Sequence, residues 1–327
     1  MQGVLSAQKI YSLNDCIRTG LEKNFSILIT KNDEAIARNN FTPGNAGFLP
    51  SVNISGNQTG SLGNNSYDFS DGTSSEANGQ STGTTNAGIN LGLTIFNGFN
   101  VQTTYRKLSE LKEIGELNTQ LVIENLVSEI ISGYYNYIRQ VKLLNNFQYA
   151  VTLSKERLRI DEDRYLLGSS SKLQLLQSRV YLNADSTNLS TQKEVVRATM
   201  VRLNELMALE NLGDVFVSQD SSIEISHNLM YEKLLEETLA KNTNLLIAAK
   251  NKTVSEYDYK ITASRYYPYL NLSSGYNYSL YSYTKSSIKN QTTDGFNYGL
   301  TLGINVFDGF NQRRNMRNSS LNVKNSE

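Results

Sequence analysis

The residue types that most often carry catalysis or hold metal ions are scarce in this sequence. It contains a single cysteine, Cys16, and a single histidine, His227. A disulfide therefore cannot form within the chain, and neither can a zinc site built from three or four Cys and His ligands. No P-loop, GxGxxG or HExxH motif occurs. The sequence thus predicts no catalytic, cofactor-binding or metal-binding residues, and the chain is not expected to be an enzyme.

The other ionisable residues are interpreted as structural. Lys and Arg together number 31, the same as Asp and Glu, so no nucleic acid partner is expected. The charged run over 157–164 is interpreted as a solvated, ion-paired helix face, and a role in gating the nearby turn is the alternative. Cys16 is expected to be a small buried apolar side chain on a helix. His227 is expected on the surface of a polar linker.

An internal repeat organises the elements that carry these residues. Residues 16–56 align without a gap on 234–274, at an offset of 218 positions. A second block, 88–100, aligns on 299–311 at an offset of 211 and ends in both copies with Phe-(Asn/Asp)-Gly-Phe-Asn. Chance similarity of two helices does not produce a second block in the same order. We therefore divide the chain into a first repeat, 8–228, and a second repeat, 229–327.

Each repeat is predicted to begin with a helix, over 13–47 in the first and over 229–266 in the second. In the first repeat Asn14 or Asp15 is the predicted N-cap, and apolar residues recur at helical spacing from Ile17 to Leu28. The helix is expected to stop before Pro50, because a residue that precedes proline is disfavoured in the α region.

A β-hairpin follows in each repeat, over 51–96 and 269–307. In the second repeat apolar residues such as Leu270 alternate with small polar residues such as Asn271. About ten alternating residues is the length of a tilted membrane-spanning strand. The polar segments 61–84 and 284–295 are predicted to be the hairpin loops. The side chains predicted to face a water-filled lumen are Asn90, Thr94, Asn271, Asn277, Thr301 and Asn305.

The same alternation is typical of a soluble antiparallel sheet with one solvated face, which remains the alternative. The long flanking helices favour a membrane sheet, as do Tyr266, Tyr267 and Tyr269, which lie where an interfacial aromatic girdle would be. No run of about 18 apolar residues occurs, so a transmembrane helix is not expected. Four strands cannot close a barrel and lipid does not tolerate an open sheet edge, so several chains would have to share one barrel.

A long helical hairpin is predicted over 100–208. Residues 100–165 contain no proline, and a helix of that length would span roughly 100 Å. Apolar residues spaced by four and three on the first helix, and by seven from Leu182 to Leu203 on the second, predict coiled-coil packing. Gly168 is predicted to end the first helix, and Ser169 to Ser171 are predicted to cap the second. A linker over 209–228 follows, with a small strand at 215–217.

The two ends of the sequence carry separate expectations. Residues 1–7 are interpreted as the remnant of a secretory signal peptide, with an ordinary frayed terminus as the alternative. A helix is predicted to start at 310 and to run to 327, so that the second repeat is incomplete and lacks a second helical hairpin. As given, the chain is therefore not expected to build a complete helical tunnel.

The order of these elements resembles the TolC-type outer membrane efflux proteins, the outer membrane factor family, over essentially the whole chain. The resemblance rests on the duplicated order of helix, strand hairpin, Phe-(Asn/Asp)-Gly-Phe turn and long helical hairpin. It also rests on the Arg164-Tyr165-x-x-Gly168-x-x-Ser171 turn followed by Leu173. It implies an α+β membrane protein, C-terminally truncated here, in which a homotrimer shares one β-barrel and the paired long helices form a periplasmic tunnel.

The resemblance also implies a location, partners and a function. The chain would lie in the cell outer membrane, in contact with its lipid, with the helical part in the periplasm. A periplasmic adaptor (membrane fusion) protein would meet the turn, and an inner-membrane pump would supply the energy. The expected function is the passive exit duct of a tripartite efflux or type I secretion system. The residues expected to contact the adaptor are Tyr165, Gly168, Ser171 and Leu173.

Three alternatives stay open at this stage. The turn could be a simple helix–turn–helix joint with no partner. The chain could be a trimeric structural surface protein with a coiled-coil stalk and no transport, although such a stalk would have one long heptad array rather than two strand hairpins framed by helices. It could also be a soluble coiled-coil enzyme, a reading that the missing catalytic groups argue against.

Overall fold

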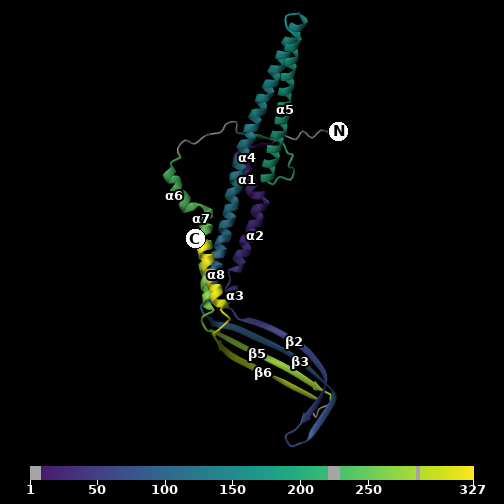
Figure 1. Cartoon of the computed structure of the whole chain (residues 1–327), viewed down its shortest axis with the longest axis vertical. Helices are drawn as coiled ribbons and strands as arrows, with labels where there is room; N and C mark the ends of the chain where they lie inside the picture. The colour runs from purple at the N-terminus through teal and green to yellow at the C-terminus, as the bar shows by residue number, and fades with distance from the viewer. Residues whose placement is uncertain (1–8, 220–228, 285–287) are drawn as a thin grey trace. The chain divides into compact units, whose positions relative to one another are not determined.

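The computed structural model describes residues 9–219, 229–284 and 288–327 (Figure 1). The predictions for residues 1–7 and for His227 lie outside these residues. The chain divides into two compact units. We call the described residues of 9–35 and 115–246 the helical unit, and those of 36–114 and 247–327 the strand unit.

Two antiparallel helices form the centre of the helical unit. α4 spans Asn100–Leu166, of which residues 115–166 belong to this unit, and α5 spans Lys172–Leu206. They run side by side to the turn that joins them (Figure 1). Leu182, Leu189 and Val196 of α5 are half-buried and Leu203 is fully buried, as the seven-residue spacing predicts.

An apolar core forms where α1, Leu13–Lys23, packs against this hairpin. Ile130, Tyr134 and Leu203 are completely buried in it. Cys16 is also completely buried, as expected from its sequence context, and burial raises the pKa of its thiol to about 12. α1 and α4 approach each other closely at Gly20, which has no side chain. A Cβ at this position would lie 2.5 Å from Ile130 Cδ1.

The N-cap of α1 is Ser12, which corrects the prediction of Asn14 or Asp15. Ser12 Oγ accepts a hydrogen bond from the Asp15 N–H at 3.2 Å, and the Asp15 carboxylate accepts one from the Ser12 N–H at 3.2 Å. This reciprocal pair is a capping box. The hydrogen bonds from Ser12 lower the pKa of Asp15.

The single helix predicted over 13–47 is interrupted in the structure. It consists of α1, α2 (Phe25–Asn40) and α3 (Pro43–Ala46). Asn24 has extended backbone between α1 and α2, with ψ 125°. Its side chain accepts the Ser26 N–H at 2.8 Å and donates to the Leu206 carbonyl at 3.0 Å. Asparagine competes with the helical backbone for hydrogen bonds in this way, which explains the break.

The helix predicted over 229–266 is interrupted at the repeat counterpart of the same residue. α6 spans Tyr231–Lys241 and α7 spans Thr243–Ser264, with Asn242 between them at ψ 116°. Asn242 lies 218 positions after Asn24, and its side chain accepts the Leu245 N–H at 3.1 Å. Two equivalent breaks support the alignment of the repeats.

A small parallel sheet joins the two ends of the first repeat within the helical unit. β1, Lys9–Tyr11, pairs with β4, Phe216–Ser218. The second of these overlaps the small strand predicted at 215–217. The sheet fastens the segment before α1 to the segment after α5.

The strand unit contains one antiparallel sheet of four long strands. β2 (Ser51–Asp68), β3 (Ser74–Asn97), β5 (Tyr269–Tyr283) and β6 (Asn290–Gly303) lie in that order (Figure 1). The central pair, β3 and β5, joins the two repeats. β2 and β6 are the edge strands, so each has one edge without a strand partner in the described chain.

The hairpin loops are much shorter than predicted. Residues 61–84 were expected to be a loop, but β2 and β3 stay paired as far as Asp68 and Ser74. Side chains reinforce this pairing, as where Asn65 Nδ2 donates to Gln80 Oε1 at 2.7 Å. The segment is rich in Gly, Asn and Ser and lacks the apolar alternation on which the prediction relied. Because Gly and Asn are depleted in strands, its pairing depends on cross-strand contacts rather than on local strand propensity. β6 likewise begins at Asn290, inside the loop predicted over 284–295.

The Phe-(Asn/Asp)-Gly-Phe motif forms the same turn twice, between β3 and α4 and between β6 and α8 (Asn311–Asn325). Gly98 and Phe99 have φ of 67° and 65°, and their counterparts Gly309 and Phe310 have φ of 68° and 63°. The Phe96–Phe99 and Phe307–Phe310 ring pairs both meet edge to face, with centroids 5.3 Å apart. The repeated motif therefore specifies one strand-to-helix geometry.

Candidate functional site

The sheet presents one polar face, and most of the predicted lumen residues lie on it. Thr94 pairs with Asn271, and Asn271 pairs with Thr301, so these three form a row across three strands. Asn90 and Asn277 lie an even number of residues from this row on β3 and β5, and therefore share its face. This common face is a geometric result, and its contact with a lumen stays a prediction.

Asn305 is the exception, and its assignment to a strand face is corrected. β6 ends at Gly303, which pairs with Tyr269, the first residue of β5. The next position of β5 in this direction is Pro268, which has no N–H to continue the ladder. Asn305 therefore follows the strand and lines a pocket at the helix end of the sheet.

Two asparagines of the polar face lie across glycines of the neighbouring strand. A Cβ added at Gly275 would lie 2.5 Å from Asn90 Oδ1, and one at Gly88 would lie closer still to Asn277 Oδ1. Asn277 Nδ2 also donates to Asn297 Oδ1 at 2.7 Å. The amides thus extend over the sheet surface and fill the space that side chains at these glycines would take. The cross-strand register carries this arrangement, so the order of residues alone did not reveal it.

The opposite face of the sheet is apolar and uncovered. Ile89 pairs with Ile54 and with Tyr276, and these three side chains are 51%, 81% and 52% exposed. A soluble sheet would bury this face against its own helices, whereas the described strand unit leaves it open. The large exposed residues of this face are Val52, Ile54, Leu62, Ile89, Tyr276, Tyr278, Phe296, Tyr298, Leu300 and Leu302.

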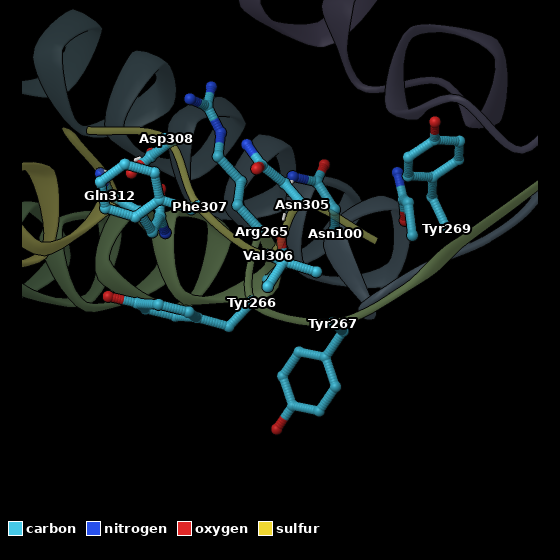
Figure 2. Close-up of a pocket in the computed structure, with 12 residues that line it drawn as sticks. Asn100, Arg265, Tyr266, Tyr267, Tyr269, Asn305, Val306, Phe307, Asp308 and Gln312 are labelled. Carbon is cyan, nitrogen blue, oxygen red and sulfur yellow. Dashed lines mark hydrogen bonds between the residues drawn. The ribbon is translucent and has the colours of Figure 1, made fainter. Parts of the chain in front are cut away.

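A pocket of about 430 Å³ lies at the helix end of the sheet, where the two repeats meet. Asn100 comes from the first repeat, and its Nδ2 donates to Ser264 Oγ of the second at 3.2 Å. Figure 2 shows the ring of Tyr267 directed away from Asn100 and Arg265. Tyr266, Tyr267 and Tyr269 all line the pocket and are all exposed, as an aromatic girdle would require.

The turn between α4 and α5 has the geometry that the sequence predicts. Gly168 has φ 74°, its N–H donates to the Tyr165 carbonyl at 3.0 Å, and the Ser169 N–H donates to the Arg164 carbonyl at 2.9 Å. This pair of bonds is a Schellman motif, which ends α4 at a glycine. Ser171 Oγ then caps α5 by accepting the Gln174 N–H at 3.3 Å.

The surface of this turn is unusually apolar for a solvated joint. Leu166, Leu167 and Leu173 are 81%, 83% and 73% exposed, and Tyr165 is 40% exposed. A Cβ at Gly168 would meet nothing within 4 Å. The turn thus combines a fixed backbone with a bare apolar surface, which is what a docking surface requires. We call Tyr165–Leu173 the tip.

One residue below the tip departs from its prediction. Asp161 belongs to the charged run interpreted as a solvated face, yet it is only 5% exposed. Its carboxylate accepts hydrogen bonds from Ser178 Oγ and, at 3.3 Å, from Gln174 Nε2 of α5. Asp161 therefore joins the two helices beneath the tip. Arg159 behaves as predicted and pairs with Glu156 at 2.7 Å and with Asp163 at 3.1 Å on the exposed face.

The described residues offer neither a metal-binding cluster nor a helix suited to crossing a membrane. Within residues 9–219, 229–284 and 288–327, no group of three or more His, Cys, Asp or Glu side chains is placed to hold a metal ion. Among the helices that the structure describes, none has the length and apolar character needed to cross a membrane.

Comparisons with known proteins identify the architecture. Residues 17–212 match the family model described as "Outer membrane efflux protein". Outer membrane protein TolC of Vibrio cholerae serotype O1 is 21% identical over 199 residues, which cover 61% of this chain and 44% of that protein. The chain thus spans less than half the length of this curated relative.

Solved structures share the fold. A membrane protein from Pseudomonas aeruginosa has a TM-score of 0.78 at 16% identity, with 96% of this chain and 71% of that chain covered. The CmeC outer membrane channel of Campylobacter jejuni has a TM-score of 0.74 at 16% identity, with 96% and 66% covered. VceC of Vibrio cholerae has a TM-score of 0.72 at 15% identity, with 96% and 73% covered. The predicted α+β fold of long helices and an antiparallel sheet is therefore confirmed.

Proposed function

Because the chain belongs to the outer membrane efflux protein family, we propose that it is one protomer of the exit duct of a tripartite efflux or type I secretion system. Family membership places the chain in the outer membrane and confirms that it is not an enzyme. In the proposed assembly three protomers share one barrel. An inner-membrane pump drives export through a periplasmic adaptor, and the duct itself is passive.

One observation carries the proposal: the two faces of the sheet have opposite solvent preferences, and the outer edges of β2 and β6 lack a strand partner in the part of the chain that the structure describes. The apolar face, with Ile54 81% exposed, suits lipid. The polar face, with Asn90 and Asn277 lying over glycines, suits water. An open edge is unstable in lipid because its N–H and C=O groups have no partner, so the sheet must be completed by other chains.

Planar-bilayer recording tests this function against the alternative of a structural surface protein without transport. The protein is expressed from its complete gene, purified from outer membranes in detergent and inserted into the bilayer. Stepwise conductance increments support a duct. A correctly assembled protein that inserts without conducting would reject transport and favour the structural alternative.

The tip is the proposed contact with the adaptor. Its three exposed leucines, Leu166, Leu167 and Leu173, offer apolar surface, and the Schellman motif at Gly168 holds the backbone in place. A preformed surface binds at a lower entropic cost than a mobile loop. These features favour a docked partner over a joint without one.

Replacing Gly168 with tryptophan should therefore block capture of the adaptor hairpin. Overpacking a well-fitted contact costs about 1–3 kcal/mol, so capture should fall by about 5- to 150-fold. The fold should persist, because the new Cβ meets nothing within 4 Å and the left-handed backbone costs about 1–2 kcal/mol. The matched control is Tyr149→Trp, at a position 72% exposed on α4. Undiminished pull-down by Gly168→Trp would argue against adaptor contact at the tip.

A further inference from the structure

We propose that the pocket at the helix end of the sheet binds the anionic group of an exported organic solute, and that the guanidinium of Arg265 is the principal contact. The proposal rests on the proposed function, because it places the pocket on the export path. It goes further by naming a site on that path and a chemical class of solute, an organic anion with a carboxylate or phosphate group.

The polar lining of the pocket continues the polar face of the sheet. Tyr269 lies two residues before Asn271 and pairs with Asn97, so both Tyr269 and Asn97 belong to that face. A Cβ at Gly303 would lie 2.9 Å from Tyr269 Cε1, so the Tyr269 ring extends over β6. Asn305 follows two residues after Gly303 and also lines the pocket. Under the proposed function this face lines the duct, and a solute that moves along it meets the pocket.

Arg265 brings an unpaired positive charge to the pocket. Within residues 9–219, 229–284 and 288–327 its guanidinium has no ion pair and no hydrogen bond. By contrast, Lys107 and Lys250 of the same strand unit are paired, Lys107 with Asp258 at 2.5 Å and Lys250 with Glu110 at 2.8 Å. Arginine presents five N–H donors in a planar fork that matches a carboxylate or a phosphate group. The free guanidinium therefore favours an anionic ligand.

The asparagines around Arg265 leave donors free. Asn97 Oδ1 accepts a backbone N–H of α4 at 3.3 Å, and Asn100 Oδ1 accepts a threonine hydroxyl of α4 at 3.2 Å. Among the described residues, Asn97 Nδ2 and the Asn305 amide have no partner. Figure 2 shows Arg265, Asn305 and Asn100 extending toward the same side. The free donors can thus add hydrogen bonds to an anion held by Arg265.

One carboxylate, that of Asp308, also lines the pocket. It makes no ion pair with Arg265. Asp308 Oδ2 instead accepts the Gln312 N–H in the first turn of α8 at 2.8 Å. A helix N-terminus stabilises a carboxylate through its free N–H groups and its dipole. The negative charge of the pocket is thus compensated by α8, whereas the positive charge is not compensated.

The internal repeat shows that this junction does not require an arginine. At the 218 offset the counterpart of Arg265 is Gly47, and that of Tyr266 is Phe48. The first repeat therefore connects its helix to its strand without a charge and without a phenol hydroxyl at these positions. Because the same connection forms without them, the Arg265 guanidinium is available for a ligand.

The remaining walls suit the apolar body of an organic anion. Val306 and Phe307 line the pocket and are 88% and 71% exposed, and Tyr266 lines it as well. The volume of about 430 Å³ lies in the range of small-molecule sites. An inorganic anion would contact only the polar groups, so these walls favour a solute that carries aromatic or aliphatic surface beside its charge.

Block of single-channel current tests the site. The protein is expressed from its complete gene, purified from outer membranes and recorded in planar bilayers with 2-naphthoate as the probe. The matched probe is 2-naphthamide, which has the same rings without the charge. We expect 2-naphthoate to block the current reversibly at a concentration about tenfold or more below that of 2-naphthamide, because hydrogen bonds between charged groups are among the strongest in proteins.

Substitutions then assign the block to Arg265. Arg265→Gln should raise the half-blocking concentration of 2-naphthoate about tenfold or more, and Arg265→Lys should raise it less, since lysine keeps the charge but not the planar fork. Asp308→Asn should lower it, because this change removes negative charge and keeps an acceptor for the Gln312 N–H. The matched control is Arg106→Gln, which removes an exposed arginine of α4 outside the pocket and should change nothing.

Equal block by the two probes, or the same half-blocking concentration in the Arg265→Gln and unsubstituted proteins, would overturn the site. A conducting protein with either result leaves the duct in place, whereas a correctly assembled protein that inserts without conducting overturns the duct and the site together. Lipid analysis of the purified protein distinguishes a solute from a membrane headgroup. A phospholipid that co-purifies with the unsubstituted protein and is lost from Arg265→Gln would assign the pocket to lipid and reject the solute.

Discussion

Replacing Ile89 with arginine is expected to prevent the protein from accumulating in the outer membrane. Ile89 lies on the apolar face and pairs with Tyr276, the middle residue of β5. An arginine facing lipid near the midplane costs about 2–4 kcal/mol, which corresponds to about 30- to 900-fold in the insertion equilibrium of each protomer. Quantitative immunoblots of washed outer membranes, with assembled and heat-dissociated protein resolved on gels, measure the loss.

Asn90→Arg is the matched control, because it places the same side chain one residue away on the opposite face. The Asn90 side chain already extends over Gly275, where no side chain of the neighbouring strand competes for the space. An arginine at position 90 can follow the same path and keep its guanidinium solvated. Accumulation should stay near the level of the unsubstituted protein, while single-channel selectivity should shift toward anions because positive charge is added to the lumen. Equal loss of both variants would contradict the assignment of the two faces.

Replacing Gly98 with alanine should destabilise the protomer much more than replacing Gly309 with alanine. Both glycines have nearly the same φ, 67° and 68°, so both substitutions cost about 1–2 kcal/mol for a left-handed backbone. Only at Gly98 does the new Cβ overlap the carbonyl of Ser264, and overpacking of this kind adds about 1–3 kcal/mol. Urea unfolding of the detergent-solubilised protein compares the two variants.

The Gly309→Ala variant is the matched control, because its new Cβ meets only Asn311 Nδ2, 3.8 Å away, and so carries the left-handed strain without the overlap. Indistinguishable unfolding midpoints for Gly98→Ala and Gly309→Ala would show that the close approach at Gly98 has no energetic consequence.

Features with a period or a motif could be predicted from the sequence. The alternation from Leu270 to Leu280 placed a strand because successive side chains point to opposite faces. The Phe-(Asn/Asp)-Gly-Phe motif marked both strand-to-helix turns, because glycine adopts positive φ readily. The repeat then related one copy to the other, and Gly168 marked the end of α4.

Features that depend on tertiary contacts could not be predicted from the sequence. Asn24 looks like an ordinary helix residue until its side chain is seen to bind the carbonyl of Leu206. Asp161 looks solvated among charged neighbours, and only the approach of α5 buries it. The outer part of the first hairpin lacks apolar alternation, so its pairing depends on partners across the strand, such as Asn65 with Gln80. Asn305 lies beyond Gly303, the last paired residue of β6, because the facing position on the neighbouring strand is Pro268, which has no N–H.

The central claim is that the two faces of the sheet are bathed in different solvents, and spin-label accessibility along β5 measures this directly. Labels are placed one at a time at positions 270–280 in the protein assembled in lipid bilayers, and collisions with oxygen and with a water-soluble nickel chelate are recorded. We expect oxygen access to peak at Leu270, Leu272, Tyr276 and Leu280, and chelate access to peak at Asn271, Ser273 and Asn277. Apolar positions shielded from both reagents, as in a sheet buried against its own helices, would contradict the account.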